Sequence, residues 1–443
     1  MRREEIIANT EAIVREAKAL GADEAIANTV IGSYRQIRFS NDRIDIGLSW
    51  RDYSTSVMIS WRRRVALTEI KDFRDAPGAL RRLIGLAKIS RENPGYGGVA
   101  KGRFEYAGPM ADGAIERIED PSEYIEEAIG AAKREAGEGA ETGGILFTKY
   151  ERVFLCSSEG PEGWDERSAI ELSIRAFSQR DASGHGVECS NSLRDFDPAR
   201  AGRKAGEIAK LAANPRAGRA GVYDVVLDPL FFGSLMGVYG SMGSAFHAMT
   251  RMSIFSDKLG ERVAPDIVTI RDDPRSCSIN CRAFDDEGVP VRETVFIERG
   301  ILRTFFHNTS TAKAFGTETT GHAGIIVPMP WNLSMDPGDF GRDEMLEELR
   351  GGLYLTNTWY TRFHNYATGD FSTIPRDGIF LVEGGEVRES WKGIRVSDNA
   401  LRILSSISAI SKERQRVHWW LEADPPSLSP YVLIEGVRIT EPD

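Results

Sequence analysis

Apolar side chains near the N-terminus recur every three or four residues, which is the period of a helix that buries one face. They are Ile6, Ile13, Val14, Ala17 and Leu20, followed by Gly21 as a helix stop. Four later stretches begin with an Asp that lies one or two residues before a proline, namely Asp75, Asp120, Asp197 and Asp228. Asp accepts hydrogen bonds from the free N–H groups of a first helical turn, where Pro has no N–H to leave unpaired. The pattern therefore predicts helices that start at these positions.

The last of these helices is predicted to run from Pro229 to Met252. Its apolar residues, among them Phe231, Leu235 and Tyr239, lie on all sides and alternate with Gly and Ala. A helix that is apolar all round is normally buried against several neighbours. We therefore expect a core helix.

Alternating apolar and polar residues predict strands from about residue 25 to residue 70 and again after residue 264. Hairpin turns are predicted at residues 285–288, 298–300, 383–385 and 435–436. The stretch 214–221 is rich in Gly, Pro and Asn and is typical of a linker. We predict an α+β protein, with a helix-plus-sheet domain at residues 1–215 followed by a β-rich domain at residues 220–443.

Composition narrows the range of partners. A net charge of −10 argues against a nucleic-acid surface, because such surfaces neutralise phosphates with Lys and Arg. The one dense basic run, Trp61–Val65, is expected to be a solvated strand edge. The N-terminus lacks the apolar core of a signal peptide, and no apolar run approaches the roughly 18 residues that span a bilayer. With only four scattered cysteines, we expect a cytoplasmic protein that binds neither nucleic acid nor membrane.

Motifs for independent catalysis are absent from the sequence. No two of its six histidines lie within five residues of each other, whereas a helical zinc site needs two converging imidazoles. The Gly-x-Ser-x-Gly elbow of hydrolases and the phosphate-binding Gly-x4-Gly-Lys-Ser/Thr loop do not occur. The glycine-rich stretch Gly95–Ala100 follows a proline instead of a strand, which favours a turn over a dinucleotide loop.

Several segments resemble the TldD/PmbA peptidase family. Ser253–Ala264 resembles the segment that follows the zinc-binding His-Glu-x-x-x-His helix of the catalytic, TldD-type subunit. Further similarity lies at residues 293–302, 365–372 and 378–387. The family's spacing places the first histidine, the catalytic glutamate and the second histidine on Met236, Gly237 and Ser241. None of these three can bind zinc or transfer a proton at neutral pH. The C-terminal cysteine ligand of the catalytic subunit is also missing, and His418 is the one candidate ligand in that region.

The resemblance implies a non-catalytic, TldE (PmbA)-type subunit. Such a chain binds no cofactor itself and forms a heterodimer with a TldD-like catalytic subunit that carries zinc, and the pair processes unfolded or leader-bearing peptides. It also implies that the helix from Pro229 lies near a subunit interface. The alternative is an independent peptide- or protein-binding homodimer without peptidase activity.

The segment from Trp359 to Phe371 is the candidate peptide cleft. Arg362, His364 and Asn365 can donate hydrogen bonds to peptide carbonyls, and aromatic residues beside Arg are typical of binding sites. Asp370 completes the predicted site, next to a tight turn. The alternative is a purely structural turn capped by Asp370 and fixed by the ring of Phe371.

Overall fold

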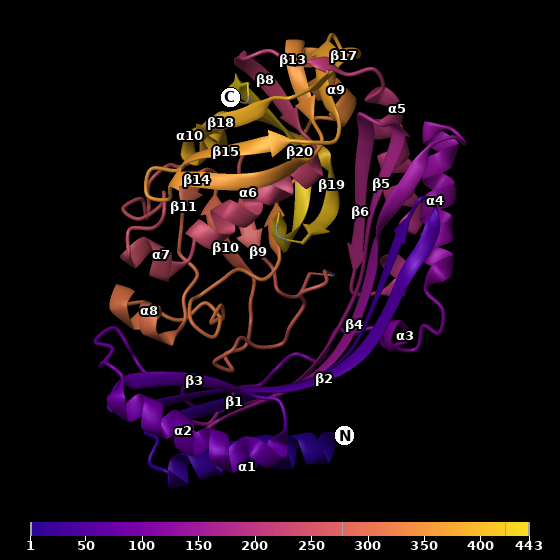
Figure 1. The fold of residues 1–443 in the computed structure, drawn as a ribbon. Helices are drawn as coiled ribbons and strands as arrows, with labels where there is room; N and C mark the ends of the chain where they lie inside the picture. The colour runs from indigo at the N-terminus through magenta and orange to yellow at the C-terminus, as the bar shows by residue number, and fades with distance from the viewer. Residues whose placement is uncertain (1, 277, 421, 442–443) are drawn as a thin grey trace.

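The structure, a computed structural model, describes residues 2–276, 278–420 and 422–441 and is built on two β-sheets. The first sheet is antiparallel in the order β3-β2-β1-β4-β5-β6. Its strands are β1 (Glu24–Ser40), β2 (Arg43–Trp61), β3 (Arg64–Ile70), β4 (Glu141–Ser157), β5 (Glu162–Gln179) and β6 (Ala182–Ser190). The sheet bends, so that its concave face wraps around the rest of the chain (Figure 1).

Helices cover the convex face of the first sheet (Figure 1). They are α1 (Arg3–Ala19), α2 (Ala76–Ile89), α3 (Gly113–Glu116), α4 (Ser122–Ala136) and α5 (Pro198–Leu211). Helices α1 and α2 pack on β1–β3, while α4 and α5 pack on the other half of the sheet. Helices begin at the predicted positions, and the Asp197 side chain caps α5 through the N–H of Arg200, whereas the Asp75 side chain caps no N–H of α2.

The second sheet contains both parallel and antiparallel strand pairs. Its first strand begins at Arg216, shortly after α5 ends at Leu211. Its larger strands are β8 (Gly221–Leu227), β13 (Arg350–Leu355), β14 (Thr358–Asn365), β15 (Asp370–Pro375), β16 (Ile379–Glu383), β17 (Glu386–Lys392), β18 (Arg395–Asn399), β19 (Ile407–Trp419) and β20 (Ala423–Thr440). Short strands complete it, namely β7 (Arg216–Ala217), β9 (Ile270–Asp272), β10 (Thr294–Glu298), β11 (Ile301–Leu302) and β12 (Leu333–Met335). The α+β class predicted from the sequence is confirmed.

Five helices accompany the second sheet: α6 (Pro229–Met242), α7 (Ala245–Met249), α8 (Thr309–Phe315), α9 (Arg342–Glu348) and α10 (Ala400–Ser405). As predicted, α6 is a core helix, and its aromatic residues lie in the largest apolar cluster. None of the described helices is long and apolar enough to cross a membrane.

Two sequence predictions about elements are wrong. The stretch from Pro229 to Met252 is two helices, because the chain turns after Met242 and the N–H of Ala245 bonds to the carbonyl of Phe306. Residues 435–436 are no hairpin turn; they lie within β20 at a shift in its register against β8, where the N–H of Gly436 bonds to Asp224. The turns at 298–300 and 383–385 are confirmed, joining β10 to β11 and β16 to β17.

Candidate functional site

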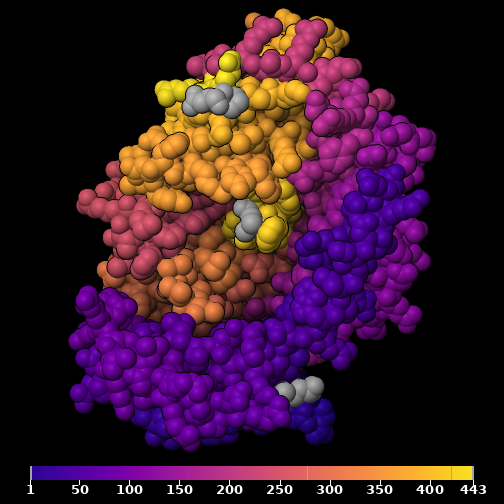
Figure 2. Space-filling model, viewed as in Figure 1, coloured from indigo at the N-terminus to yellow at the C-terminus, as the bar shows by residue number. Residues whose placement is uncertain are grey.

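A groove opens between α6, the β14–β15 hairpin and the start of β20. It has a volume of about 480 Å³. Its lining residues are Ser234, Gly237, Val238, Ser241, Met242, His247, Met252, Thr361, Phe363, Tyr366, Glu422 and Asp424. Figure 2 shows this face of the molecule hollowed beneath the orange strands of the hairpin, beside yellow C-terminal residues. The groove thus joins both regions that the sequence singled out, the altered zinc motif and the segment around residue 365.

Helix α6 turns two residues of the altered zinc motif toward the groove and the third into the core. Gly237 and Ser241 are one helical turn apart, so both face the groove. Met236 points away into the apolar core and is fully buried. A histidine at position 236 would therefore enter the core instead of the groove.

The residues of the groove do not fit a zinc ion. A Cβ atom added to Gly237 would lie 2.5 Å from the backbone oxygen of Asp424, a contact that no real side chain tolerates. A glutamate at this position would require the backbone of β20 to move. Ser241 and Met236 offer a hydroxyl and a thioether in place of two imidazoles, which are the ligands that zinc prefers. Over the described residues there is no group of three or more His, Cys, Asp or Glu side chains that could hold a metal.

Two histidines lie near the groove, and both already have partners. His247 lines the groove, and its Nδ1 atom is 2.8 Å from the carbonyl oxygen of Ser241. His418, the candidate ligand from the sequence, contacts Glu171 of β5 at 2.5 Å through Nδ1. Burial lowers the pKa of His418, but Glu171 and Asp424 outweigh this effect and hold that pKa above its usual value. His418 therefore links β19 to β5 through its contact with Glu171.

The β14–β15 hairpin presents a different set of side chains to the groove from the one chosen by sequence. Thr361, Phe363 and Tyr366 line it. Arg362 and His364 occupy the alternate positions of β14 and are exposed on its other face, with the Arg362 guanidinium 4.5 Å from the ring centre of Tyr360. The alternation itself was readable from the sequence, but nothing in it says which face is turned inward.

The remaining predicted residues shape the turn. The side-chain oxygen of Asn365 accepts hydrogen bonds from the N–H groups of Ala367 and Thr368. Asp370 accepts from the Thr368 hydroxyl and from the amide of Asn399. These contacts account for Asn365 and Asp370 as turn residues. That Arg362, His364, Asn365 or Asp370 touches a peptide stays a prediction.

A carboxylate closes one side of the groove. Glu422 accepts a hydrogen bond of 2.9 Å from the backbone N–H of Tyr360. Burial raises the pKa of Glu422 above its usual value. Glu422 therefore ties the start of β20 to β14 and fixes the width of the groove at this side.

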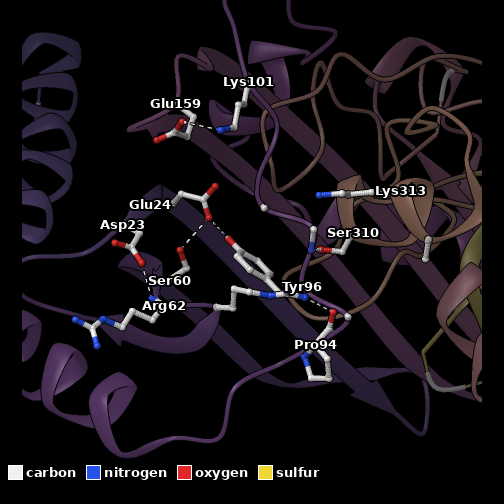
Figure 3. Close-up of a pocket in the computed structure, with 15 residues that line it drawn as sticks. Asp23, Glu24, Ser60, Arg62, Pro94, Tyr96, Lys101, Glu159, Ser310 and Lys313 are labelled. Atoms are coloured by element: carbon white, nitrogen blue, oxygen red, sulfur yellow. Dashed lines mark hydrogen bonds and ion pairs between the residues drawn. The ribbon is translucent and has the colours of Figure 1, made fainter.

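A second cavity, of about 630 Å³, lies where the β2–β3 turn and residues 94–101 meet α8 (Figure 3). Its polar groups largely satisfy one another. Glu24 accepts hydrogen bonds from Ser60 and Tyr96, and Lys101 lies 3.4 Å from Glu159. The N–H of Gly97 donates to the Ser310 hydroxyl. The glycine-rich stretch is thus a turn, as predicted, that fastens α8 to the first sheet.

The basic run belongs to the same region. Arg62 and Arg63 form the turn between β2 and β3 with positive φ angles of 48° and 60°. The backbone N–H of Arg62 donates to Asp23. The run is therefore a turn that closes the β2–β3 hairpin, which places it at the end of the strands instead of along an edge.

Comparison with known proteins gives consistent matches. Residues 220–441 match the family described as PmbA/TldA metallopeptidase C-terminal domain, and residues 114–213 match the corresponding central domain. A protein from Methanothermobacter thermautotrophicus named metalloprotease is 29% identical over 310 residues, which cover 64% of this chain and 67% of that protein. A metalloprotease of Methanocaldococcus jannaschii is 33% identical over 206 residues, 44% of either protein. The match thus spans less than half of the second relative.

The fold has a close counterpart among solved structures. The crystal structure of TldE from Thermococcus kodakarensis superimposes with a TM-score of 0.87, covering 98% of this chain and 100% of that chain. Sequence identity between the two is 19%, so this likeness shows the fold alone.

Proposed function

Because this chain belongs to the TldD/PmbA metallopeptidase family, we propose that it is the metal-free subunit of a heterodimeric zinc peptidase of the TldD/TldE type. One observation carries the proposal: the backbone of Asp424 packs against Gly237, where the catalytic glutamate would stand. In this proposal a TldD-like sibling carries the zinc ion and the catalytic residues, and the chain described here shapes the cleft that the peptide enters.

The groove supports a peptide in extended form. Strand β14 pairs only with β15 among the described strands, so its other edge, apart from the Tyr360 N–H that Glu422 binds, offers backbone groups for main-chain hydrogen bonds. Pairing of this kind binds extended chains with little sequence preference. Phe363 and Tyr366, stacked with ring centres 5.2 Å apart, add an apolar surface along the groove. Unfolded or leader-bearing peptides are the substrates that suit such a surface, since folded proteins have few free strands.

Co-expression with a sibling that contains His-Glu-x-x-x-His tests the proposal. We expect a one-to-one complex that cleaves an unfolded peptide, and we expect both the zinc and the activity to disappear when the first histidine of the sibling is replaced by Ala. The matched change in this chain, Ser241→Ala, should leave the zinc content of the complex unaltered.

Two results would contradict these expectations. A chain that forms no complex with its sibling would contradict the proposal and favour the independent binding homodimer. Loss of zinc from the complex on Ser241→Ala would show that this chain contributes to the metal site.

A further inference from the structure

A third cavity lies between the concave face of the first sheet and the part of the chain that contains α7 and α8 (Figure 1). Its volume is about 330 Å³, at the small end of the range of about 300–1,000 Å³ that is typical of small-molecule sites. Three neighbouring strands form one wall, because Ile26 of β1 lies opposite Met58 of β2, which lies opposite Leu67 of β3. The sheet thus presents a continuous row of apolar side chains to this cavity.

The opposite wall of the cavity is also apolar. Phe246 and Met249 of α7 are 39% and 46% exposed. Ile325 and Ile326, in the loop after α8, are 48% and 76% exposed. Apolar side chains that remain exposed on both sides of a cavity favour a ligand with an apolar group, because binding removes this surface from water.

One carboxylate of the cavity has an oxygen without a partner. Glu287 is buried, with 9% of its surface exposed, and its Oε2 atom accepts hydrogen bonds from the backbone N–H and the hydroxyl of Thr309. Its Oε1 atom accepts no hydrogen bond from any described residue. The side-chain oxygen of Asn28, which also lines the cavity, likewise has no partner among the described residues. Buried acceptors normally have a donor, and a ligand can supply it here.

The cavity is also negatively charged. Its described lining residues include Asp286 and Glu287 but no Lys, Arg or His. Burial, together with the charges of Asp286 and Glu24, raises the pKa of Glu287 to about 7. Asp286 lies 3.7 Å from Arg282, whereas no described residue forms an ion pair with Glu287. A positive group on a ligand would stabilise the ionised form of this carboxylate.

An ammonium group suits this cavity better than a metal ion. No three of the described His, Cys, Asp or Glu side chains lie close enough together to hold a metal. An ammonium group needs no such set, because it donates up to about three hydrogen bonds to single acceptors. The carbon chain attached to it can lie between the two apolar walls.

We propose that this cavity binds an ammonium group that carries an apolar substituent, as at the free amino terminus of a peptide with an apolar first residue. The ammonium group donates to Glu287, and the apolar substituent packs between Leu67 and Phe246. This goes beyond the proposed function, because the cavity and the groove between α6 and β14 share no lining residue.

Binding of short peptides to the isolated full-length chain tests the proposal. The probe is the peptide Leu-Ala-Ala-Ser amide, titrated by calorimetry with a free and with an acetylated amino terminus. Acetylation removes the charge and keeps the leucine side chain, so the acetylated peptide should bind about tenfold or more weakly. Pentylamine has the same two groups without a peptide. Tighter binding of the free peptide than of pentylamine assigns the cavity to peptide termini, and equal binding assigns it to amines in general; both support recognition of the ammonium group.

Substitutions in the walls locate the binding. Leu67→Arg places a guanidinium group at the cavity and should weaken binding of the free peptide about tenfold or more. The matched control Leu86→Arg changes an exposed leucine of α2, on the other face of the sheet, and should leave binding unchanged. Glu287→Gln keeps an oxygen for Thr309 and removes the charge, so it should reduce the difference between the free and the acetylated peptide. Circular dichroism checks that each variant is folded.

The proposal is overturned if the acetylated peptide binds as tightly as the free one, or if neither the peptide nor pentylamine binds at millimolar concentration. It is also overturned if Leu67→Arg and Leu86→Arg bind the free peptide equally well. None of these measurements uses zinc, a sibling subunit or peptide cleavage, so they leave the proposed function to its own test.

Discussion

Gly237 is the residue of α6 against which the backbone of Asp424 in β20 packs. Family spacing assigns it the position of a catalytic glutamate, and the fold uses its missing side chain to bring the backbone of β20 against α6. Ser241, one turn later, keeps the groove lined by a small hydroxyl group. Packing therefore explains the glycine at position 237.

Gly237→Ala is predicted to destabilise the protein. The added Cβ atom would lie 2.5 Å from the oxygen of Asp424, and overpacking of this kind costs about 1–3 kcal/mol. Gly85→Ala is the matched control, since Gly85 also lies inside a helix but has no atom within 4 Å of the added Cβ. It should stabilise by about 0.5–1 kcal/mol. Urea denaturation of both variants measures the difference, and equal stabilities would refute the contact.

At the scale of elements, some side chains of the β14–β15 hairpin are buried in the core and others line the groove. Phe371 is buried in the core, with 2% of its surface exposed, whereas Phe363 lines the groove and Arg362 lies on the opposite face. The two sequence interpretations of this segment, a binding site and a structural turn, therefore apply to different side chains of the same hairpin.

Three alanine substitutions separate these roles. Phe371→Ala should lower the free energy of unfolding by about 3–5 kcal/mol, as expected for a buried ring. Phe363→Ala should reduce peptide turnover by the reconstituted complex with a smaller loss of stability. Arg362→Ala should leave stability almost unchanged and weaken peptide capture by about 1–3 kcal/mol if its guanidinium bonds to the peptide. Unaltered turnover in Arg362→Ala beside reduced turnover in Phe363→Ala would remove Arg362 from the site.

The link between β19 and β5 predicts a dependence on pH. Glu171 and Asp424 raise the pKa of His418 above its ordinary value of 6.5, against burial and the nearby Lys149. A group with a raised folded-state pKa stabilises fully below its unfolded pKa and loses that contribution as pH rises through the folded pKa. The stability advantage of the wild type over His418→Gln should therefore shrink above pH 6.5. Denaturation curves of both proteins below and above pH 6.5 measure this difference in stability. A stability difference that does not change with pH would contradict the ion pair.

At the scale of the whole molecule, local signals predicted the elements and distant contacts set their ends. The Asp-Pro signal marked the start of α6, but its end depends on a bond between Ala245 and the carbonyl of Phe306. Gly436 has the composition of a turn, yet its contact with Asp224 places it inside a long strand. These interactions join residues far apart in the chain, and no local pattern contains them.

The sequence predicted some residues of the candidate site but not the contacts that shape it. Spacing identified Gly237 and Ser241, which the structure places on one groove. The sequence could not show that Asp424 closes the position of the glutamate, or that Thr361 and Phe363 face inward in place of Arg362. Both facts follow from the way β20 and β14 pack on α6.

The central claim is that this chain holds no zinc and leaves catalysis to a sibling, and metal analysis of the isolated protein tests it most directly. The chain is purified alone, equilibrated with excess zinc, dialysed, and measured by elemental analysis alongside an assay on an unfolded peptide. The account predicts far less than one zinc per chain and no cleavage. About one tightly held zinc per chain, together with cleavage that a chelator abolishes, would contradict it.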